Sequence, residues 1–292
     1  MTEILPVPAA TAGYKIVEIA PGVRSVHSLA ERETFHPVIG PVAEAEALYV
    51  RQLDLAGRLR DHTGEFVVWD VGLGAAANTL TLLRATREIA CSLRLLSFDH
   101  TLAPLEFALQ HAGQLGYLAG WEARLEELME KGRIAFRSGA QSVEWELRVA
   151  DFPALLSQPA AREMPKPHAI LFDAYSPAKN PAMWTQPLFG NLFRLLDPRR
   201  PCALPTYSRS TMLRVTLLLA GFFVGEGHAT GEKEETTMAA NTLEFIAEPL
   251  DRRWLERARR STSAEPLWEP AYRQARLTPE TWERLQQHPQ FA

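Results

Sequence analysis

Four short apolar runs in the middle of the chain each end beside an aspartate. The aspartates are Asp70, Asp99, Asp151 and Asp173. Segments with helical spacing separate the runs, and alternation of this kind indicates βαβ units around a mostly parallel sheet. Open sheets of this class bind ligands at the carboxyl ends of their strands. The pattern therefore predicts an α/β fold, with a twisted parallel sheet, helices on both faces and carboxylates gathered at one edge.

The chain divides into three predicted parts. Residues 1–60 form an N-terminal β arm and a helix over 41–60 that cover the site, residues 61–250 the central α/β domain, and residues 251–292 a helical C-terminal extension. Strands are expected at 66–69, 93–98, 147–149, 169–172, 203–207 and 241–247. Helices are expected at 78–90, 104–118, 122–130, 184–196 and 212–220. In the extension, Thr278 and Pro279 are typical of a helix start.

Composition narrows the class of protein. With 292 residues, of which 46% are hydrophobic, the chain can bury a sizeable core. The net charge of −4 gives no global signature of nucleic-acid binding, although a local patch can suffice. Cys91 and Cys202 have no metal-like spacing, so we expect no metal site and a reducing cytoplasm. The first residues lack the pattern of a signal peptide, and the longest apolar run, 217–224, is too short to span a bilayer.

A glycine-rich turn follows the first of the four runs. Gly72, Leu73 and Gly74 lie between a strand and a helix, where glycines permit a sharp turn and close approach of a ligand. Ala77 can take the third position of the dinucleotide fingerprint, so the turn alone leaves NAD open. A structural turn without a ligand is a further alternative.

The strand-end acids favour a nucleoside cofactor. Asp99 can accept hydrogen bonds from ribose hydroxyls, and Asp151 with Phe152 can bind an adenine amine and stack on its ring. Asp70, beside the glycine turn, would repel the phosphates that a dinucleotide places at a helix N-terminus. The same carboxylate suits the ammonium of a methionine moiety. Charge therefore favours S-adenosylmethionine.

Residues 173–185 form a long motif, Asp-Ala-Tyr-Ser-Pro-Ala-Lys-Asn-Pro-Ala-Met-Trp-Thr. The motif resembles the signature of the methyltransferase-domain family of the bacterial enzyme that completes 5-methylaminomethyl-2-thiouridine at the tRNA wobble position. Segments 35–45, 72–78, 206–222 and 231–233 are similar to the family in the same order, so the resemblance covers residues 27–247. Some relatives are fused to a flavin oxidase domain, and we expect a stand-alone form here.

The chain departs from the family pattern in three places. Ala76 replaces the third glycine of the turn, and Phe-His-Pro at 35–37 replaces Tyr-His-Ser. The loop around Lys233 lacks a second basic residue and continues with acids, which disfavours tRNA binding at that face.

The resemblance implies a class I S-adenosylmethionine-dependent methyltransferase that methylates a primary amine on tRNA. Because a simple alkylamine has a pKa of about 10, the amine must lose a proton before it reacts, and Asp173 is expected to orient it and take that proton. The expected cofactor residues are Asp70, Gly72, Leu73, Gly74, Asn78, Asp99, Asp151 and Phe152. The expected substrate residues are His36, Tyr175, Ser176, Pro177, Lys179, Asn180 and Trp184.

Several alternatives stay open at this point. Trp184 can be a core residue, Lys179 a loop cap and His36 a structural histidine. The acids equally suit an enzyme that transfers methyl or aminopropyl groups to a small amine such as a polyamine, and the altered turn suits a non-catalytic RNA-binding relative. Residues 251–276 hold seven arginines against four acids, with Trp254, Trp268 and Tyr272 between them. They form either a tail that packs its aromatics on the body or a phosphate-binding patch. The sequence leaves the oligomeric state undetermined.

Overall fold

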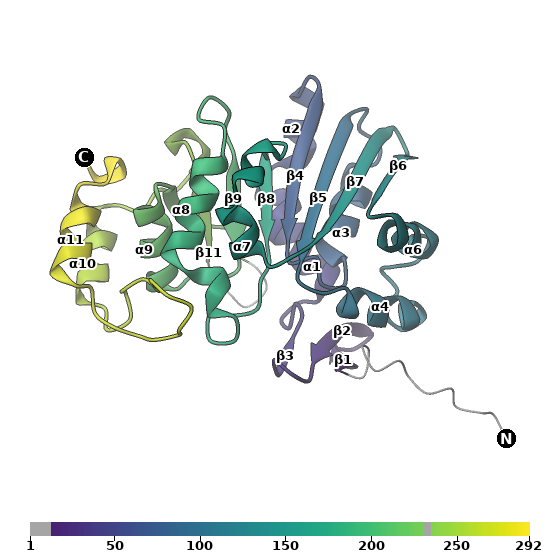
Figure 1. The fold of residues 1–292 in the computed structure, drawn as a ribbon, viewed down its shortest axis with the longest axis horizontal. Helices are drawn as coiled ribbons and strands as arrows, with labels where there is room; N and C mark the ends of the chain where they lie inside the picture. The colour runs from purple at the N-terminus through teal and green to yellow at the C-terminus, as the bar shows by residue number, and fades with distance from the viewer. Residues whose placement is uncertain (1–12, 230–234) are drawn as a thin grey trace.

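The computed structural model describes residues 13–229 and 235–292. Its centre is an eight-stranded sheet in the order β10-β11-β9-β8-β4-β5-β7-β6 (Figure 1). The strands are β4 (Glu65–Val71), β5 (Ser92–Asp99), β6 (Arg133–Ser138), β7 (Gln141–Val149), β8 (Ala169–Phe172), β9 (Ala203–Thr206), β10 (Phe223–Gly227) and β11 (Thr236–Ala240). The five strands from β9 to β7 pair in parallel, and β6, β10 and β11 pair antiparallel at the two edges. The predicted α/β fold with a mostly parallel sheet is confirmed.

Helices cover both faces of the sheet. One face carries α1 (Pro41–Ala45), the π-helical η1 (Glu46–Arg51), α2 (Leu55–Asp61), α3 (Ala77–Thr86), α4 (Ala103–Gln110), α5 (Ala112–Leu115) and α6 (Glu122–Lys131). The other carries α7 (Phe152–Ser157), α8 (Gln186–Leu195) and α9 (Thr211–Ala220). Successive side chains of a strand point to opposite faces, so Phe66 and Val68 join the first core while Val67 and Trp69 join the second. This is why the central strands are continuous apolar runs.

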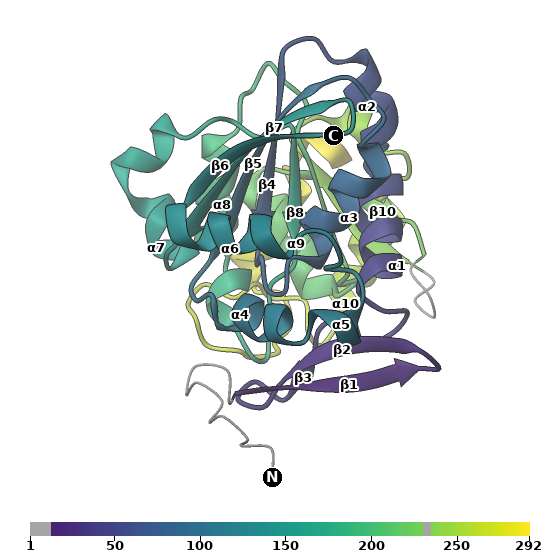
Figure 2. The ribbon, with the colours of Figure 1, turned by 90° about the vertical axis from the view of Figure 1, so that its right-hand side faces the viewer.

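A small antiparallel sheet lies beyond the carboxyl ends of the central strands (Figures 1 and 2). It consists of β1 (Tyr14–Ala20), β2 (Val23–Ser28) and β3 (Glu33–Thr34). Residues 31–37, which include β3 and lead towards α1, are called the N-terminal strap below. The strap brings residues from the start of the chain to the edge of the sheet where the predicted carboxylates end.

Some predicted elements differ from the structure. The expected helix over 41–60 is split into α1, η1 and α2, with a break at Asp54, whose φ of 43° lies in the left-handed region. The expected strand over 241–247 is wrong: the strand is β11, and the Asn241 side chain instead binds the carbonyls of Asp197 and Arg200 at 3.0 Å each. The hairpin partner β6 was not predicted, because the polar residues that alternate along β6 and β7 weaken the strand signal.

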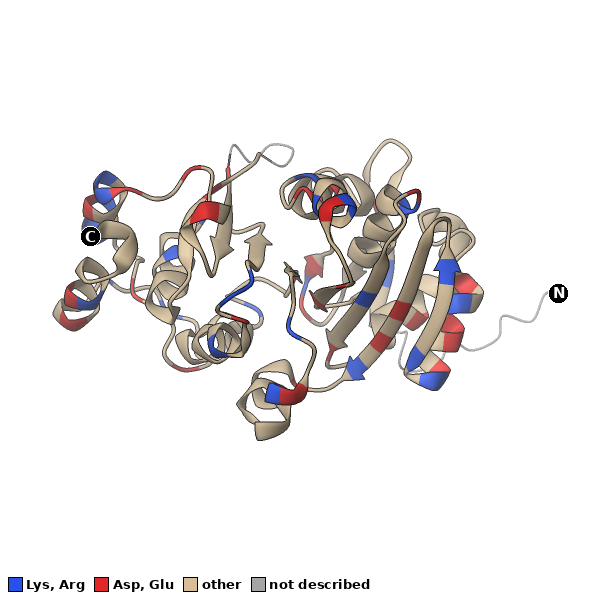
Figure 3. Ribbon diagram, turned by 90° about the horizontal axis from the view of Figure 1, so that it is seen from above, with Lys and Arg blue, Asp and Glu red and all other residues tan. Residues whose placement is uncertain are grey.

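The C-terminal extension packs on the body through α10 (Arg252–Arg260) and α11 (Pro279–Gln286). Trp254 is 5% exposed and joins the second core, while the Arg259 and Arg284 guanidinium groups lie over Trp282 and Trp268. Figure 3 shows both signs of charge on these helices. As predicted, the Thr278 side chain caps α11. These contacts favour the packing interpretation of the tail. Within the described ranges, no helix is long and apolar enough to cross a membrane.

Candidate active site

A cavity of about 700 Å³ opens at the carboxyl ends of the central strands. Four groups of residues form its wall: the glycine turn after β4 (residues 72–76), the ends of β5 and β7, the loop after β8 (residues 173–180, called the β8 loop), and the N-terminal strap. The predicted row of strand-end residues therefore meets at one place. Of the predicted site residues, those that line the cavity are His36, Gly72, Leu73, Gly74, Asp99, Asp151, Phe152, Asp173, Tyr175, Ser176, Lys179 and Asn180.

The glycine turn lies against the protein's own backbone. Gly72 has a φ of 90°, and a Cβ atom at this position would lie 2.5 Å from the carbonyl oxygen of Asp173. Glycine is thus required both by the backbone conformation and by the close approach of the β8 loop. Ala76, the departure from the family pattern, is buried and adopts a φ of 61° as the N-cap of α3. The turn therefore keeps the left-handed conformation that a third glycine would adopt without strain.

Two of the strand-end acids order the loops that carry them. The Asp99 carboxylate accepts hydrogen bonds from the backbone N–H groups of Gly74 at 2.9 Å and His100 at 2.8 Å. Asp151 caps α7 by accepting from the N–H of Ala154 at 2.7 Å. Both side chains still line the cavity. Asp99 and Asp151 thus stabilise the loops at one end of the cavity and also expose carboxylate oxygens to it.

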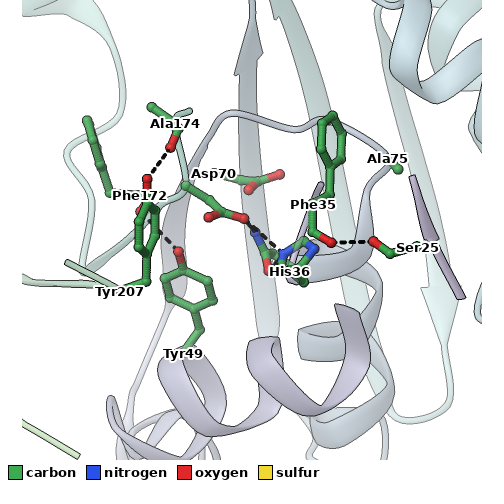
Figure 4. A network of polar contacts seen from close by, with 12 residues as sticks. Ser25, Phe35, His36, Tyr49, Asp70, Ala75, Phe172, Ala174 and Tyr207 are labelled. Carbon is green, nitrogen blue, oxygen red and sulfur yellow. Dashed lines mark hydrogen bonds and ion pairs between the residues drawn. The ribbon is translucent and has the colours of Figure 1, made fainter. Parts of the chain in front are cut away.

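The backbone of the β8 loop is held by side chains from distant segments. The Tyr49 hydroxyl donates to the carbonyl of Phe172 at 3.0 Å, and the Tyr207 hydroxyl donates to the carbonyl of Ala174 at 3.0 Å (Figure 4). Burial raises the pKa of both tyrosines well above the usual value, so both remain donors. The loop that delivers Asp173 is thereby preorganised.

Asp173 is held by two donors on one oxygen. Its Oδ2 lies 2.9 Å from Nε2 of His36 and accepts from Nδ2 of Asn78 at 2.8 Å. Burial lowers the pKa of His36, but the negative charge and hydrogen bond of Asp173 outweigh burial and the pKa is raised above its ordinary value. His36 has a φ of 49°, a conformation that costs free energy in a non-glycine residue and often accompanies function. The raised pKa favours the protonated form of His36 beside the Asp173 carboxylate.

Four predicted site residues do not line the cavity. Asp70 is 1% exposed and accepts from Thr79 at 2.7 Å and Ser97 at 3.0 Å, and burial raises its pKa to about 6. Its predicted contact with a ligand ammonium is therefore corrected: Asp70 braces the start of α3 from beneath. Asn78 is likewise corrected, because its amide is turned to Asp173 and His36 instead of to a ligand.

The other two corrections concern the β8 loop and the helix after it. Trp184 is completely buried and donates from its indole to the carbonyl of Tyr175 at 2.7 Å, so it supports the loop and offers no surface for a base. Pro177 lies outside the cavity lining. Both residues shape the loop that presents their neighbours.

Sequence reasoning did not identify several residues of the wall. Glu44 is 5% exposed and lines the cavity, as do Glu33, Phe35 and Tyr207. Glu44 and Tyr207 fall in segments that carry the family resemblance, which is the signal that could have found them. Glu33 has no such signal, because it belongs to a two-residue strand.

The wall of the cavity carries more acidic than basic side chains. Six carboxylates face the cavity, and they belong to Glu31, Glu33, Glu44, Asp99, Asp151 and Asp173. The lysine and arginine side chains of the same lining are Lys179 and Arg32, and both residues are exposed. In the part of the chain that the structure describes, neither forms an ion pair. A wall rich in carboxylates suits a positively charged ligand, and the two exposed cations of the same lining suit an anionic carrier of that ligand.

Residues 120–242 match the model of a family described as S-adenosyl-L-methionine-dependent methyltransferase. Among curated proteins, the chain is similar to the "tRNA 5-methylaminomethyl-2-thiouridine biosynthesis bifunctional protein MnmC" of Methylibium petroleiphilum, with 28% identity over 232 residues that cover 76% of this chain and 34% of that protein. The protein of the same name from Aeromonas salmonicida is 28% identical over 207 residues, covering 66% of this chain and 30% of the relative. The chain thus spans about a third of the length of these relatives.

Two solved structures share the fold. One is MNMC2 from Aquifex aeolicus, with a TM-score of 0.66, 22% identity, and coverage of 94% of this chain and 83% of that one. The other is a spermidine synthase, with a TM-score of 0.51, 11% identity, and coverage of 93% and 84%.

Fold, cavity and matches together define a class I S-adenosylmethionine-dependent methyltransferase. Within that class, the chain is similar to the methyltransferase part of the MnmC proteins, and the predicted resemblance is confirmed. The family's cofactor is S-adenosylmethionine. The wall fits this molecule, because its carboxylates complement a sulfonium and an ammonium.

Proposed function

We propose that the chain transfers a methyl group from S-adenosylmethionine to a primary amine on a modified uridine of tRNA, in the cytoplasm. The observation that carries the proposal is the placement of Asp173, which is fixed by His36 and Asn78 at the wall of an acidic cavity edged by exposed cations. The names of the curated relatives supply the end product, 5-methylaminomethyl-2-thiouridine in tRNA, so the proposed substrate is the corresponding uridine with an unmethylated aminomethyl group.

Each end of the cavity has a proposed role. When bound, the cofactor supplies a methyl group activated by a positively charged sulfur. The glycine turn with Leu73 would take its methionine part, Asp99 its ribose hydroxyls, and Asp151 with Phe152 its adenine. The β8 loop and the strap would take the amine and its uridine. The three-part division of the chain is consistent with this plan and stays a prediction.

The side chains around Asp173 govern the amine's proton. An alkylamine with a pKa of about 10 enters as an ammonium, which the acidic wall attracts. One proton must leave so that the nitrogen lone pair can form the new C–N bond, and the product then carries the positive charge. Because Asp173 Oδ2 is already held by His36 and Asn78, we assign Asp173 chiefly to holding the amine in line. The proton of the amine goes to water, since hydrogen bonds to a carboxylate favour its charged form and make it a weaker base.

A free polyamine is the second candidate substrate. The acidic interior favours it, and so does the shared fold with a spermidine synthase. The exposed Lys179 and Arg32 argue against it, because they repel a free polycation and attract the phosphates beside a tRNA nucleoside. We therefore rank the amine on tRNA first.

The test is methyl transfer from labelled S-adenosylmethionine. tRNA bearing the unmethylated aminomethyl group is incubated with the wild type and with Asp173→Ala, and digested nucleosides are weighed by mass spectrometry. We expect a gain of one methyl group on the wobble uridine with the wild type alone, and no product with putrescine or spermidine. Transfer to a polyamine but not to tRNA would replace this proposal with the second one.

A further inference from the structure

Glu33 connects the N-terminal strap to the β8 loop. The backbone N–H of Ser176 donates to Glu33 Oε2 at 3.1 Å, and the Ser176 hydroxyl donates to Glu33 Oε1. The two residues are 143 positions apart in the chain. One carboxylate therefore satisfies both donors of a single loop residue, and the hydroxyl that was predicted to bind substrate is already engaged.

The contact forms at the point where other supports of the loop end. Side chains of the body bind the carbonyls of residues 172, 174 and 175. From Ser176 onward the loop turns, because its carbonyl accepts from the N–H groups of Lys179 and Asn180 at 2.9 Å each. The Ser176 N–H has Glu33 as its partner. Loss of this acceptor would leave a part-buried donor unsatisfied at the start of the turn.

Three residues of the N-terminal strap each contact a residue of the β8 loop. Glu33 meets Ser176, Phe35 packs edge-on against Tyr175 with ring centroids 5.6 Å apart, and His36 meets Asp173. The strap and the β8 loop run in opposite directions at this point, so the three contacts follow one another along both segments. A shift at Glu33 would therefore reach His36 and its partner Asp173.

We infer that Glu33 is a positioning residue, which fixes the β8 loop through Ser176 and thereby sets the place of Asp173. The inference rests on the proposed function, since the loop is the proposed amine site. A carboxylate suits the role because its two oxygens match the two donors of Ser176, and charge-assisted hydrogen bonds are the stronger ones. Glu33 would then act on the rate of methyl transfer and leave cofactor binding unaffected.

The experiment compares Glu33→Ala, Glu33→Gln, Ser176→Ala and the double variant Glu33→Ala/Ser176→Ala in the full chain. Misplacement of a reacting group by an ångström can cost 100-fold, so we expect a fall in kcat of about 10-fold for Glu33→Ala, with an unchanged dissociation constant for S-adenosylmethionine by calorimetry. Glu33→Gln should recover most of the rate, because its amide can accept from the N–H and donate to the hydroxyl oxygen. The double variant should be no slower than Glu33→Ala.

Two further measurements make the outcome decisive. Glu18→Ala in β1 is the matched control: its side chain is 55% exposed and pairs with Arg24 in the same sheet, so activity should not change. Hydrogen exchange of the peptide over 174–180 should be faster in Glu33→Ala, and this readout needs no substrate. If the wild type methylates nothing but exchange responds, the proposed function fails and the positioning role stands. The positioning role would be overturned by any of three results. These are losses in kcat that add up in the double variant, a change in KM alone for Glu33→Ala, or unaltered hydrogen exchange of residues 174–180 in Glu33→Ala.

Discussion

The two ends of the cavity are built in different ways. At the proposed cofactor end, Gly72 and Asp151 follow β4 and β7, and Asp99 is the last residue of β5. The Asp99 and Asp151 carboxylates accept hydrogen bonds from the backbone of the glycine turn and of α7. At the proposed amine end, side chains from the strap, η1, α3 and the end of β9 converge on the β8 loop. The first end combines a glycine turn with carboxylates that bind the backbone of nearby loops, and the second is a network of side chains from distant segments.

This difference predicts how each end fails. The glycine turn of the first end does not tolerate an added Cβ where the backbone of the β8 loop approaches it closely. A side-chain network depends on every member, and its members should fail together. The variants below test this distinction, in order of decreasing effect.

Asp173→Asn should have the largest effect on catalysis. The amide keeps the size of the carboxylate but removes the charge that holds both His36 and the amine, so we expect kcat to fall about 10³-fold. Calorimetry should give an unchanged affinity for S-adenosylmethionine, because the cofactor end does not depend on this side chain. Loss of cofactor binding would show that the two ends are one unit.

Gly72→Ala should have the next largest effect, at the other end. The new Cβ would lie 2.5 Å from the carbonyl oxygen of Asp173, at a φ of 90°, and we expect a loss of about 3 kcal/mol in the free energy of unfolding. Thermal or urea denaturation measures the loss, and cofactor affinity should fall with it.

Ala76→Gly is the matched control in the same turn. Relief of left-handed strain is offset by a lost buried methyl and a more flexible unfolded chain, so we expect a change within about 0.5 kcal/mol. A loss at Ala76 as large as that at Gly72 would contradict the backbone account of this end.

The same distinction explains what the sequence could predict. Strands 66–69, 93–98 and 169–172 are mostly apolar, so the fold could be predicted locally. Asp99, Asp151 and Asp173 come at the ends of strands 93–98, 147–149 and 169–172, so their place at the cavity could be predicted in the same way. Whether a side chain turns towards the cavity depends on packing across the sheet. For this reason Asp70 and Asn78, in the right segments, were assigned to the ligand although their partners are Thr79, Ser97 and Asp173.

Apart from Asp173, the contacts of the amine end could not be predicted from local sequence patterns. Glu33 and Tyr49 contact the β8 loop across more than a hundred residues of sequence, and no periodicity connects positions so far apart. The split of the predicted helix 41–60 has the same origin, because the π-helical η1 places Tyr49 beneath Phe172 at the cost of regular helix geometry.

His36→Gln should have a smaller effect that depends on pH. Glutamine keeps a neutral donor, so we expect a fall of about 10-fold in kcat at neutral pH. In the wild type, the folded-state pKa of His36 is raised above the unfolded value of 6.5. The stabilisation from the His36 and Asp173 pair is thus fully present below pH 6.5 and is lost as pH rises through the folded-state pKa.

Denaturation of both proteins between pH 5.5 and 9 measures this stabilisation. The difference in unfolding free energy between wild type and His36→Gln should shrink as pH rises. A difference that is constant over this range would mean that His36 stays neutral, and Asp173 would then be the stronger base. That outcome would move the proton transfer from water to Asp173 itself.

Lys179→Gln and Arg32→Gln should have the smallest effects and should act on tRNA alone. Each variant removes one exposed cation at the edge of the cavity, so we expect KM for tRNA to rise about 3-fold per variant, and the slope of log affinity against log salt to fall by about 1. The rate with the free aminomethyluridine nucleoside should not change, because this substrate carries no phosphate. Arg24→Gln is the matched control in β2, outside the cavity lining. Equal losses of activity with tRNA and with the nucleoside would place these two cations inside the side-chain network of the amine end. An effect on tRNA alone would make them a third, electrostatic element that belongs to neither end of the cavity.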